Sequence, residues 1–121
     1  MNFEFTEDHK MIQESAKEFA REVIAPSSID RDIKAEFPTE IIKQMGELGF
    51  MGMMVTPEYG GAGLDTISYV LAMIEISKVD ASCGVIMSVN NSLVCYGLEK
   101  YGSDFIKQKY LIPLAKGEKL G

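Results

Sequence analysis

Two cysteines and a single histidine are the side chains best suited to nucleophilic or metal chemistry in this sequence. A zinc site needs a cluster of Cys, His or carboxylate ligands, and a cysteine nucleophile needs a base such as His beside it. Cys83 and Cys95 stand about 18 Å apart along one helix, too far for a disulfide, and His9 lies near the other end of the sequence. We therefore expect two reduced thiols in the core, with little support for metal or thiol catalysis.

A glycine-rich stretch, residues 56–65, suggests a second kind of chemistry, because glycine loops before a helix can cradle phosphate groups. The motif Gly-Ala-Gly at 61–63 lacks the third glycine of a dinucleotide fingerprint, since Thr66 occupies that position, and no strand–helix–strand alternation follows. No Gly-Lys-Ser/Thr motif follows either. We therefore favour a tight loop, ending at Asp65 as a helix N-cap, over a nucleotide site.

The residues from 81 to 98 carry no charged side chain, which predicts a core helix buried on most of its circumference. Helical spacing places one amide on an otherwise apolar stripe, which comprises Ile86, Val89, Asn90, Leu93 and Gly97. A buried amide without a partner costs about 1 to 3 kcal/mol, so Asn90, Asn91 and Ser92 need hydrogen bonds. Either neighbouring helices or a buried water supply these bonds, or the helix lines a cavity for a ligand with polar and apolar parts.

Length and charge argue against several functions. The 121 residues suit one domain. Twelve basic and 18 acidic residues give a net charge of −6 without a basic stripe, which argues against nucleic-acid binding. The uncharged stretch has the length of a minimal membrane span, but its serines, asparagines and glycines argue against membrane insertion. The N-terminus resembles no leader peptide, so we expect a cytoplasmic protein, or one trimmed after import.

The remaining pattern predicts an all-α fold, a helical bundle of about five or six helices with a glycine-rich loop. We expect N-caps at Thr6, Asp65 and Asp80, a second helix at an angle after Pro26, and a kink or early stop at Pro113. Residues 50–55 form either a brief extended segment or a buried loop. Apolar periodicity predicts helices over residues 7–24, 27–35, 41–48, 66–79, 81–98 and from 104 onward.

Several segments match motifs of a known family. They are Leu-Gly-Phe-Met-Gly (48–52), Pro-Glu-Tyr-Gly-Gly-Ala-Gly (57–63), Ile-Glu-Ile-Ser-Lys-Val-Asp-Ala-Ser (74–82), Tyr-Gly-Ser (101–103) and Gln-Lys-Tyr-Leu-Ile-Pro-Leu-Ala-Lys-Gly-Glu (108–118). From residue 3 to residue 121 the chain resembles the amino-terminal helical domain of the acyl-CoA dehydrogenases. The segment Gly-Val-Ile-Met-Ser-Val-Asn-Asn-Ser-Leu (84–93) is most similar to the short-chain, butyryl-type branch.

The resemblance implies an FAD enzyme that oxidises short-chain acyl-CoA to trans-2-enoyl-CoA and passes electrons to an electron-transfer flavoprotein. It also implies a homo-oligomer, for which we expect a homotetramer. Family members continue into a β-barrel domain and a second helical bundle, which carry most FAD contacts and the catalytic glutamate. We therefore expect residues 1–121 to be an N-terminal domain that is inactive alone.

By the same resemblance, Val89, Asn90 and Leu93 match positions where a helix closes the far end of the acyl tunnel. These three residues lie on the stripe found from spacing, although an amide is a poor companion for an acyl methyl group. Two alternatives stay open: a non-catalytic helical interaction module on the same scaffold, and a flavin-dependent acyl-CoA oxidase.

Overall fold

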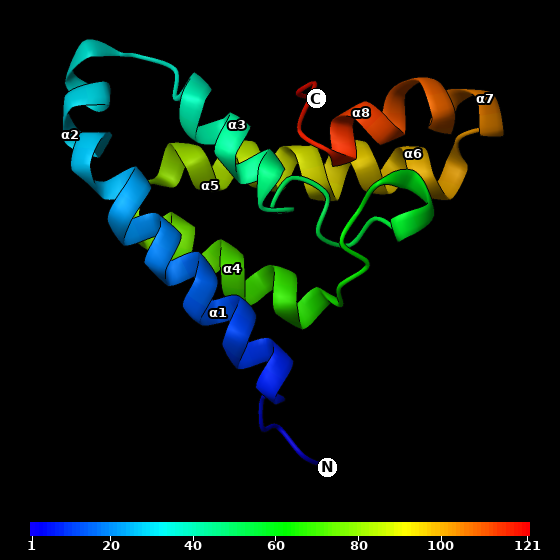
Figure 1. Cartoon of the computed structure of the whole chain (residues 1–121), viewed down its shortest axis with the longest axis horizontal. Helices are drawn as coiled ribbons and strands as arrows, with labels where there is room; N and C mark the ends of the chain where they lie inside the picture. Colours follow the sequence, from blue (N-terminus) through cyan, green and yellow to red (C-terminus); the bar gives the residue numbers. More distant parts are fainter.

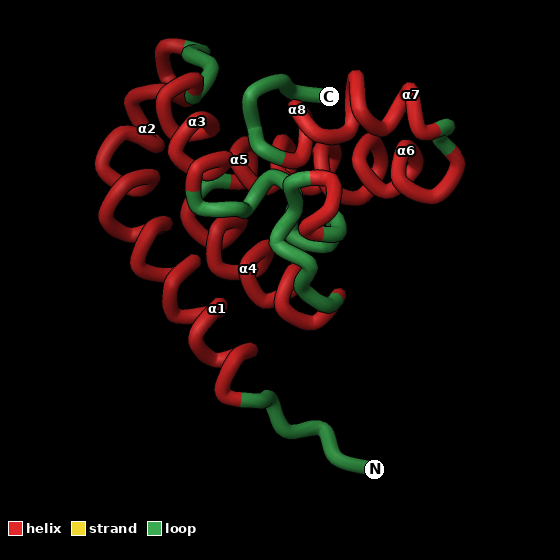
Figure 2. The backbone as a smooth tube through the Cα atoms, turned by 45° about the vertical axis from the view of Figure 1, so that its right-hand side comes forward, coloured by secondary structure: helices red, strands yellow, loops and turns green.

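The computed structural model describes all 121 residues and contains helices and loops but no β-strand (Figures 1 and 2). Five continuous helical runs make up the chain, which confirms the predicted all-α bundle. The elements in order are α1 (Glu7–Phe19), η1 (Ala20–Ile24), α2 (Ala25–Lys34), α3 (Thr39–Glu47), η2 (Pro57–Tyr59), α4 (Thr66–Val79), α5 (Ala81–Ser88), η3 (Val89–Cys95), α6 (Tyr96–Tyr101), α7 (Asp104–Ile106), η4 (Lys107–Leu111) and α8 (Ile112–Ala115). Segments η1, η3 and η4 are π-helical, and η2 is a 3₁₀ turn.

The predicted N-caps are confirmed. Thr6 Oγ1 accepts the backbone N–H of His9, and the His9 ring accepts the N–H of Thr6, so that a reciprocal capping pair starts α1. Asp65 and Asp80 accept backbone N–H groups in the same way at the starts of α4 and α5. Short polar side chains therefore fix where these three helices begin.

The helices continue through both Pro26 and Pro113, so the early stop predicted at Pro113 is wrong, while α2 runs at an angle to α1 after Pro26, as Figure 1 shows. Each proline lies in the first turn of an α-helical segment that directly follows a π-helical one: α2 follows η1, and α8 follows η4. A proline inside a regular α-helix clashes with the carbonyl four residues earlier. The wider π turn changes that spacing, so the helix continues through the ring.

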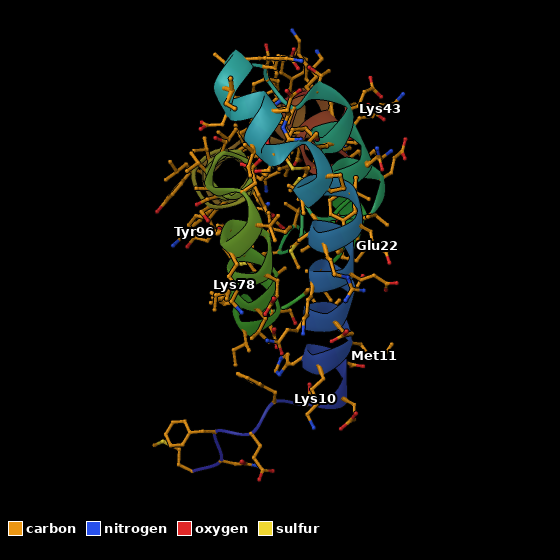
Figure 3. The ribbon with its side chains drawn as sticks, turned by 90° about the vertical axis from the view of Figure 1, so that its left-hand side faces the viewer. Lys10, Met11, Glu22, Lys43, Lys78 and Tyr96 are labelled. Atoms are coloured by element: carbon orange, nitrogen blue, oxygen red, sulfur yellow. The ribbon has the colours of Figure 1, made fainter.

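The main core lies where α1, α3, α4 and α5 meet the loop that follows α3. Helix α1 packs along α4, as Figure 3 shows from the side. Residues 50–55 form a buried loop, which settles the two alternatives for this segment. The largest fully buried side chains of this core are Ile24, Met45, Met51, Met53, Ile76 and Met87. A smaller cluster near the C-terminus comprises Val55, Cys95, Leu111, Leu114 and Ala115.

The two central helices are less enclosed than the sequence predicts. Helix α4 exposes Ile67, Val70 and Ile74, and the run α5–η3–α6 exposes Val85 and Leu93. The prediction that residues 81–98 are buried on most of the circumference is therefore met only in part, because no other element of this chain covers the side that carries Val85, Leu93 and Tyr96. Gly84 allows α5 to approach α4 closely, since a methyl group there would lie 2.2 Å from Ser77 Oγ, whereas Gly97 faces open space.

The run Ala81–Tyr101 is long and apolar enough to cross a membrane by length and composition alone. Core helices of other proteins meet the same criterion. Here one side of the run, with Cys83, Met87 and Cys95, is fully buried against the rest of the chain. The structure therefore shows this run as part of the helical bundle.

Candidate functional site

The three predicted site residues lie together in the π-helical segment η3, but they face different surroundings. Asn90 has 0 % of its surface exposed, Val89 is half-buried, and Leu93 is 70 % exposed. None of them lines any of the hollows described below. The structure therefore divides the predicted stripe into an inward amide and outward apolar side chains.

Asn90 is held by backbone groups from two distant parts of the chain. Its Nδ2 donates to the Met51 carbonyl at 2.7 Å and to the Leu114 carbonyl at 3.1 Å. Its Oδ1 accepts the backbone N–H of Gly121 at 3.1 Å. Of the two interpretations of this amide, the structure shows the first: neighbouring backbone satisfies it, and its side chain reaches no surface.

Asn91 makes a second set of bonds next to the first. Its Nδ2 donates to the carbonyls of Phe50 at 2.8 Å and Met87 at 2.9 Å, and its Oδ1 accepts the N–H of Met53 at 2.8 Å. We call Asn90 and Asn91 together the loop clamp, because both bind the buried loop after α3. The sequence marked Asn91 as an amide in need of partners, but the loop that supplies them lies about 40 positions away and carries no signal of this pairing.

The opposite side of the same helix is apolar and open. We call Val85, Val89, Leu93 and Tyr96 the outward face; Val85 is 62 % exposed and Tyr96 is 52 % exposed. An exposed apolar row of this kind marks a binding or packing surface. At its boundary, Tyr69 of α4 and Ser92 share a hydrogen bond of 2.6 Å between their hydroxyl groups.

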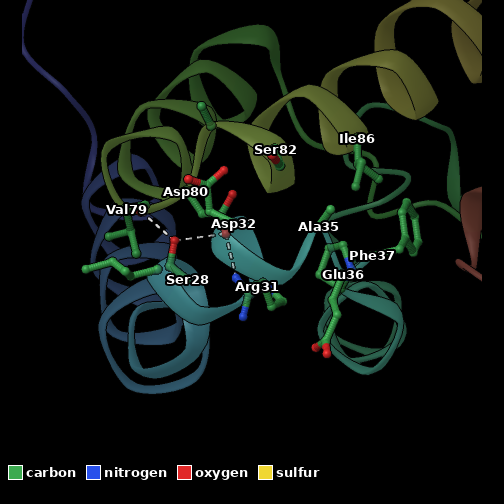
Figure 4. Close-up of a pocket in the computed structure, with 13 residues that line it drawn as sticks. Ser28, Arg31, Asp32, Ala35, Glu36, Phe37, Val79, Asp80, Ser82 and Ile86 are labelled. Atoms are coloured by element: carbon green, nitrogen blue, oxygen red, sulfur yellow. Dashed lines mark hydrogen bonds and ion pairs between the residues drawn. The ribbon is translucent and has the colours of Figure 1, made fainter.

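The largest hollow lies between α2 and the start of α5, away from the outward face, and measures about 580 Å³. At its base Arg31 donates to Asp80 at 2.5 Å, and Ser28 donates to the same carboxylate oxygen at 3.1 Å (Figure 4). Both charged side chains are only 9 % exposed. Burial acts to raise the pKa of Asp80, but hydrogen bonds from Cys83 N–H, Arg31 and Ser28 outweigh it and lower the pKa. These groups satisfy one another, so the arrangement joins helices and offers no free charge to a ligand.

A second hollow of about 440 Å³ lies beside the outward face, between the start of α4 and α6. Tyr96 forms part of its wall, and Lys100 stands 5.5 Å from the centre of the Tyr96 ring and donates to its hydroxyl. Glu99, on the same wall, accepts the backbone N–H of Thr56. The polar groups here are engaged with neighbours in the chain.

The candidate nucleophiles are in environments that suppress reactivity. Burial raises the pKa of Cys83 to about 11 and that of Cys95 to about 12, and both thiols are free, as predicted. His9 contacts Asp65, with 2.8 Å between Nε2 and Oδ2, and this bond is the main reason that the pKa of Asp65 falls to about 2. No group of three potential metal ligands is present.

The glycine-rich loop holds itself together. Gly60 and Gly63 adopt left-handed backbone angles, with φ of 84° and 64°. The backbone N–H groups of residues 61–64 all donate to carbonyls within the chain, those of Thr56, Gly52, Val55 and Met53. Since a phosphate cradle needs free N–H groups, the loop does not fit a dinucleotide, and its tight-turn geometry is as predicted.

Comparison of the sequence and the fold with known proteins identifies the family of this chain. Residues 6–118 match the family model described as acyl-CoA dehydrogenase, N-terminal domain. The chain belongs to the acyl-CoA dehydrogenase family. The short-chain specific acyl-CoA dehydrogenase of Clostridium acetobutylicum is 42 % identical over 121 residues, which are 100 % of this chain and 32 % of that protein. The chain thus spans about a third of the length of the curated relatives it matches.

Solved structures agree with this membership. Butyryl-CoA dehydrogenase from Megasphaera elsdenii superposes with a TM-score of 0.92 at 33 % identity, over 100 % of this chain and 32 % of that one. A chain solved in work on the electron transferring flavoprotein of Acidaminococcus fermentans gives a TM-score of 0.96 at 44 % identity, over 100 % of this chain and 32 % of that one. A glutaryl-CoA dehydrogenase from Mycobacterium smegmatis in complex with FADH2 superposes with a TM-score of 0.92 at 31 % identity. The match covers 97 % of this chain and 30 % of that one. FAD is therefore a cofactor of the family.

Within this acyl-CoA dehydrogenase domain, the residues that could meet a substrate are apolar. Val89 and Leu93 present side chains to the outside, whereas Asn90 supports them from within. The backbone N–H groups of residues 61–64 are bonded within the chain and leave no donor for a cofactor phosphate. The outward face therefore offers an apolar surface to a ligand, on a helix that the loop clamp holds in place.

Proposed function

We propose that this domain is the amino-terminal part of an FAD-dependent acyl-CoA dehydrogenase that oxidises short-chain acyl-CoA to trans-2-enoyl-CoA. The reaction removes the α-proton and transfers the β-hydride to FAD, and we assign the base and most FAD contacts to a β-barrel domain and a second helical bundle. The support is the match to short-chain relatives over the whole of this chain and about a third of theirs. Residues 1–121 alone would then be inactive.

The contribution of this domain is a wall of the acyl pocket, and the outward face is the observation that carries this proposal. Val89 and Leu93 are aliphatic, adjacent on that face and accessible, which suits contact with a hydrocarbon chain. Asn90 would act on the pocket only through the backbone it holds. Bulky side chains at 89 and 93 would shorten the pocket and favour short acyl groups.

The proposed partners follow the same resemblance. An electron-transfer flavoprotein would accept the electrons, and the similar chain from Acidaminococcus fermentans, solved in work on such a flavoprotein, supports this choice. Exposed apolar rows on α4 and on the outward face suit packing against further domains and other subunits, and we propose a homotetramer. We propose a cytoplasmic location without membrane insertion.

The test uses the complete gene product that contains these residues. We expect a flavin absorbance band that butyryl-CoA bleaches under anaerobic conditions, and a colourless product would overturn the proposal. Rapid hydrogen peroxide release in air would identify an oxidase instead. Reoxidation of the reduced flavin by a 3-arylacrylate would identify a reductase instead, an alternative raised by a 3-(aryl)acrylate reductase from Clostridium sporogenes that is 44 % identical over 95 % of this chain and 30 % of its own length.

The pocket wall is tested by Leu93→Ala in the same protein. Removing the side chain lengthens the pocket, so kcat/KM for octanoyl-CoA relative to butyryl-CoA should rise at least about tenfold, the lower end of the value of one methylene group in an apolar pocket. Ile33→Ala is the matched control, since Ile33 is an exposed aliphatic residue on α2, outside the outward face. An unchanged ratio in Leu93→Ala would contradict the wall.

A further inference from the structure

The single histidine of the chain joins the starts of two helices. His9 is only 8 % exposed, although residues 1–5 before it are exposed. Its Nδ1 accepts the backbone N–H of Thr6 at 3.2 Å, which completes the reciprocal cap of α1. Its Nε2 lies 2.8 Å from Asp65 Oδ2, while the other oxygen of Asp65 caps α4 by accepting the N–H of Ser68. One imidazole ring therefore connects the N-cap of α1 to the N-cap of α4.

These contacts require one particular form of the ring. A backbone N–H can only donate, so the Nδ1 that accepts it must carry a lone pair and not a proton. A neutral imidazole then carries its proton on Nε2, from which it donates to the Asp65 carboxylate. The hydrogen bonds of His9 therefore define the neutral Nε2–H tautomer, bonded at both nitrogens.

A second proton on the ring is incompatible with one of the two bonds. In the imidazolium ion both nitrogens carry hydrogen, so Nδ1–H and the Thr6 N–H would face each other as two donors. The bond to Asp65 would become stronger, because it would then join two opposite charges. Protonation thus acts against the cap of α1 and in favour of the link to α4.

The charged groups around His9 leave this ring as the part that responds near neutral pH. They are Glu4, Glu7, Asp8 and Lys10 beside it in the sequence, Asp65, Glu75 and Lys78 at and along α4, and Glu99 and Lys100 of α6, which share the second hollow with Asp65. Hydrogen bonds from His9 and Ser68 lower the pKa of Asp65 to about 2, so this carboxylate stays charged between about pH 5 and pH 8. Histidine changes its charge in that range, as does the α-amino group of Met1.

We propose that His9 makes the start of α1 sensitive to pH: the neutral ring caps the helix and holds residues 1–5, whereas the protonated ring releases them. The bond to Asp65 persists in both forms, so the release is local and α1 stays paired with α4. Phe5 belongs to the part that is held, because its ring packs edge-on to the His9 ring with 6.2 Å between their centres. This proposal involves no acyl-CoA and does not rest on the proposed function above.

The tautomer is measured by nitrogen NMR of the ring. Because the chain has one histidine, the signals of its two ring nitrogens belong to His9 without ambiguity. At about pH 8 the spectrum should show an unprotonated Nδ1 and a protonated Nε2. The opposite tautomer, or a rapid mixture of the two, would overturn the proposal.

Proteolysis measures the release. Chymotrypsin cleaves extended chain after phenylalanine, so cleavage after Phe5 requires the first turn of α1 to open and reports the open population. His9→Gln is the matched control, since glutamine at this position completes a capping box through an oxygen that does not titrate. The two chains should be cleaved at similar rates at about pH 8. At about pH 5.5 the unsubstituted chain should be cleaved about fivefold faster than His9→Gln, the value of one lost cap.

The comparison at each pH cancels the pH dependence of the protease and the titration of the Met1 amino group, which both chains share. A ratio of rates near one at the lower pH would overturn the proposal. His9→Ala lacks the cap at every pH and should be cleaved faster than His9→Gln at both, and equal rates would also overturn it. Circular dichroism should be the same at both pH values, because a loss of helix at the lower pH would mean general unfolding instead of local release.

Discussion

The inward and outward sides of the run α5–η3–α6 differ in an unusual way. The inward side buries two asparagine amides and a carboxylate beside Cys83, Met87 and Cys95, whereas the outward side exposes valine, leucine and tyrosine. Each buried polar group has a partner, so burying them costs little. This contrast indicates that buried polar groups help to fix the position of this helix, whereas the exposed apolar side chains of the outward face remain available for binding.

The largest effect is expected on the inward side, at the joint between α2 and α5. Asp80→Ala leaves Arg31 buried without its partner and removes the N-cap of α5, so the free energy of unfolding should fall by about 3 kcal/mol or more. Urea denaturation followed by circular dichroism measures the change. A loss below about 1 kcal/mol would show that the buried pair is not important for stability.

Acid provides an independent check of the same carboxylate. Its pKa in the folded chain lies below the ordinary value of 3.8, so its contribution to stability is complete above that pH and is lost as the pH falls below it. The unsubstituted chain should therefore lose stability on acidification below about pH 4. Asp80→Ala should show a shallower loss over the same range, and equal slopes would contradict the assignment.

An intermediate effect is expected at the boundary between the two sides. Tyr69→Phe removes the hydroxyl that bonds Ser92 and keeps the ring, so the free energy of unfolding should fall by about 1 kcal/mol. Ser92→Ala should give a similar value. The double variant should lose no more than either single variant, because both changes remove one shared bond; additive losses would contradict this pairing.

The smallest effect on stability is expected on the outward face. Leu93→Ser should change the free energy of unfolding by no more than about 0.5 kcal/mol, since few atoms of this chain cover the side chain. It should instead reduce self-association of the isolated chain in gel filtration, because it interrupts an apolar row. A loss above about 2 kcal/mol would show that Leu93 belongs to the core and not to the outward face.

Local chemistry in the sequence predicts the fold well. Thr6, Asp65 and Asp80 begin helices because a short polar side chain can accept backbone N–H groups there, and this property needs no distant partner. The tight turn at residues 56–65 and the two reduced thiols are also predicted from nearby residues alone, the first from its glycines and the second from the distance between Cys83 and Cys95 along one helix. The exposed faces of α4 and of the run α5–η3–α6 could not be predicted, since an apolar pattern does not say which neighbours cover it.

The candidate site could be predicted only in part. Spacing and family resemblance place Val89, Asn90 and Leu93 on one stripe of one helix, but in the structure Asn90 is buried while Leu93 is exposed. The inward direction of Asn90 depends on bonds to Met51, Leu114 and other distant backbone groups that no local pattern encodes. The pair of Arg31 and Asp80 was missed for the same reason, being 49 positions apart.

The buried loop after α3 is attached to the central helix mainly through two amide side chains, those of Asn90 and Asn91. Hydrogen bonds can be replaced by water, whereas the packing of α1 along α4 depends on apolar burial. On warming, we therefore expect this loop to detach from the central helix before the pair of α1 and α4 separates.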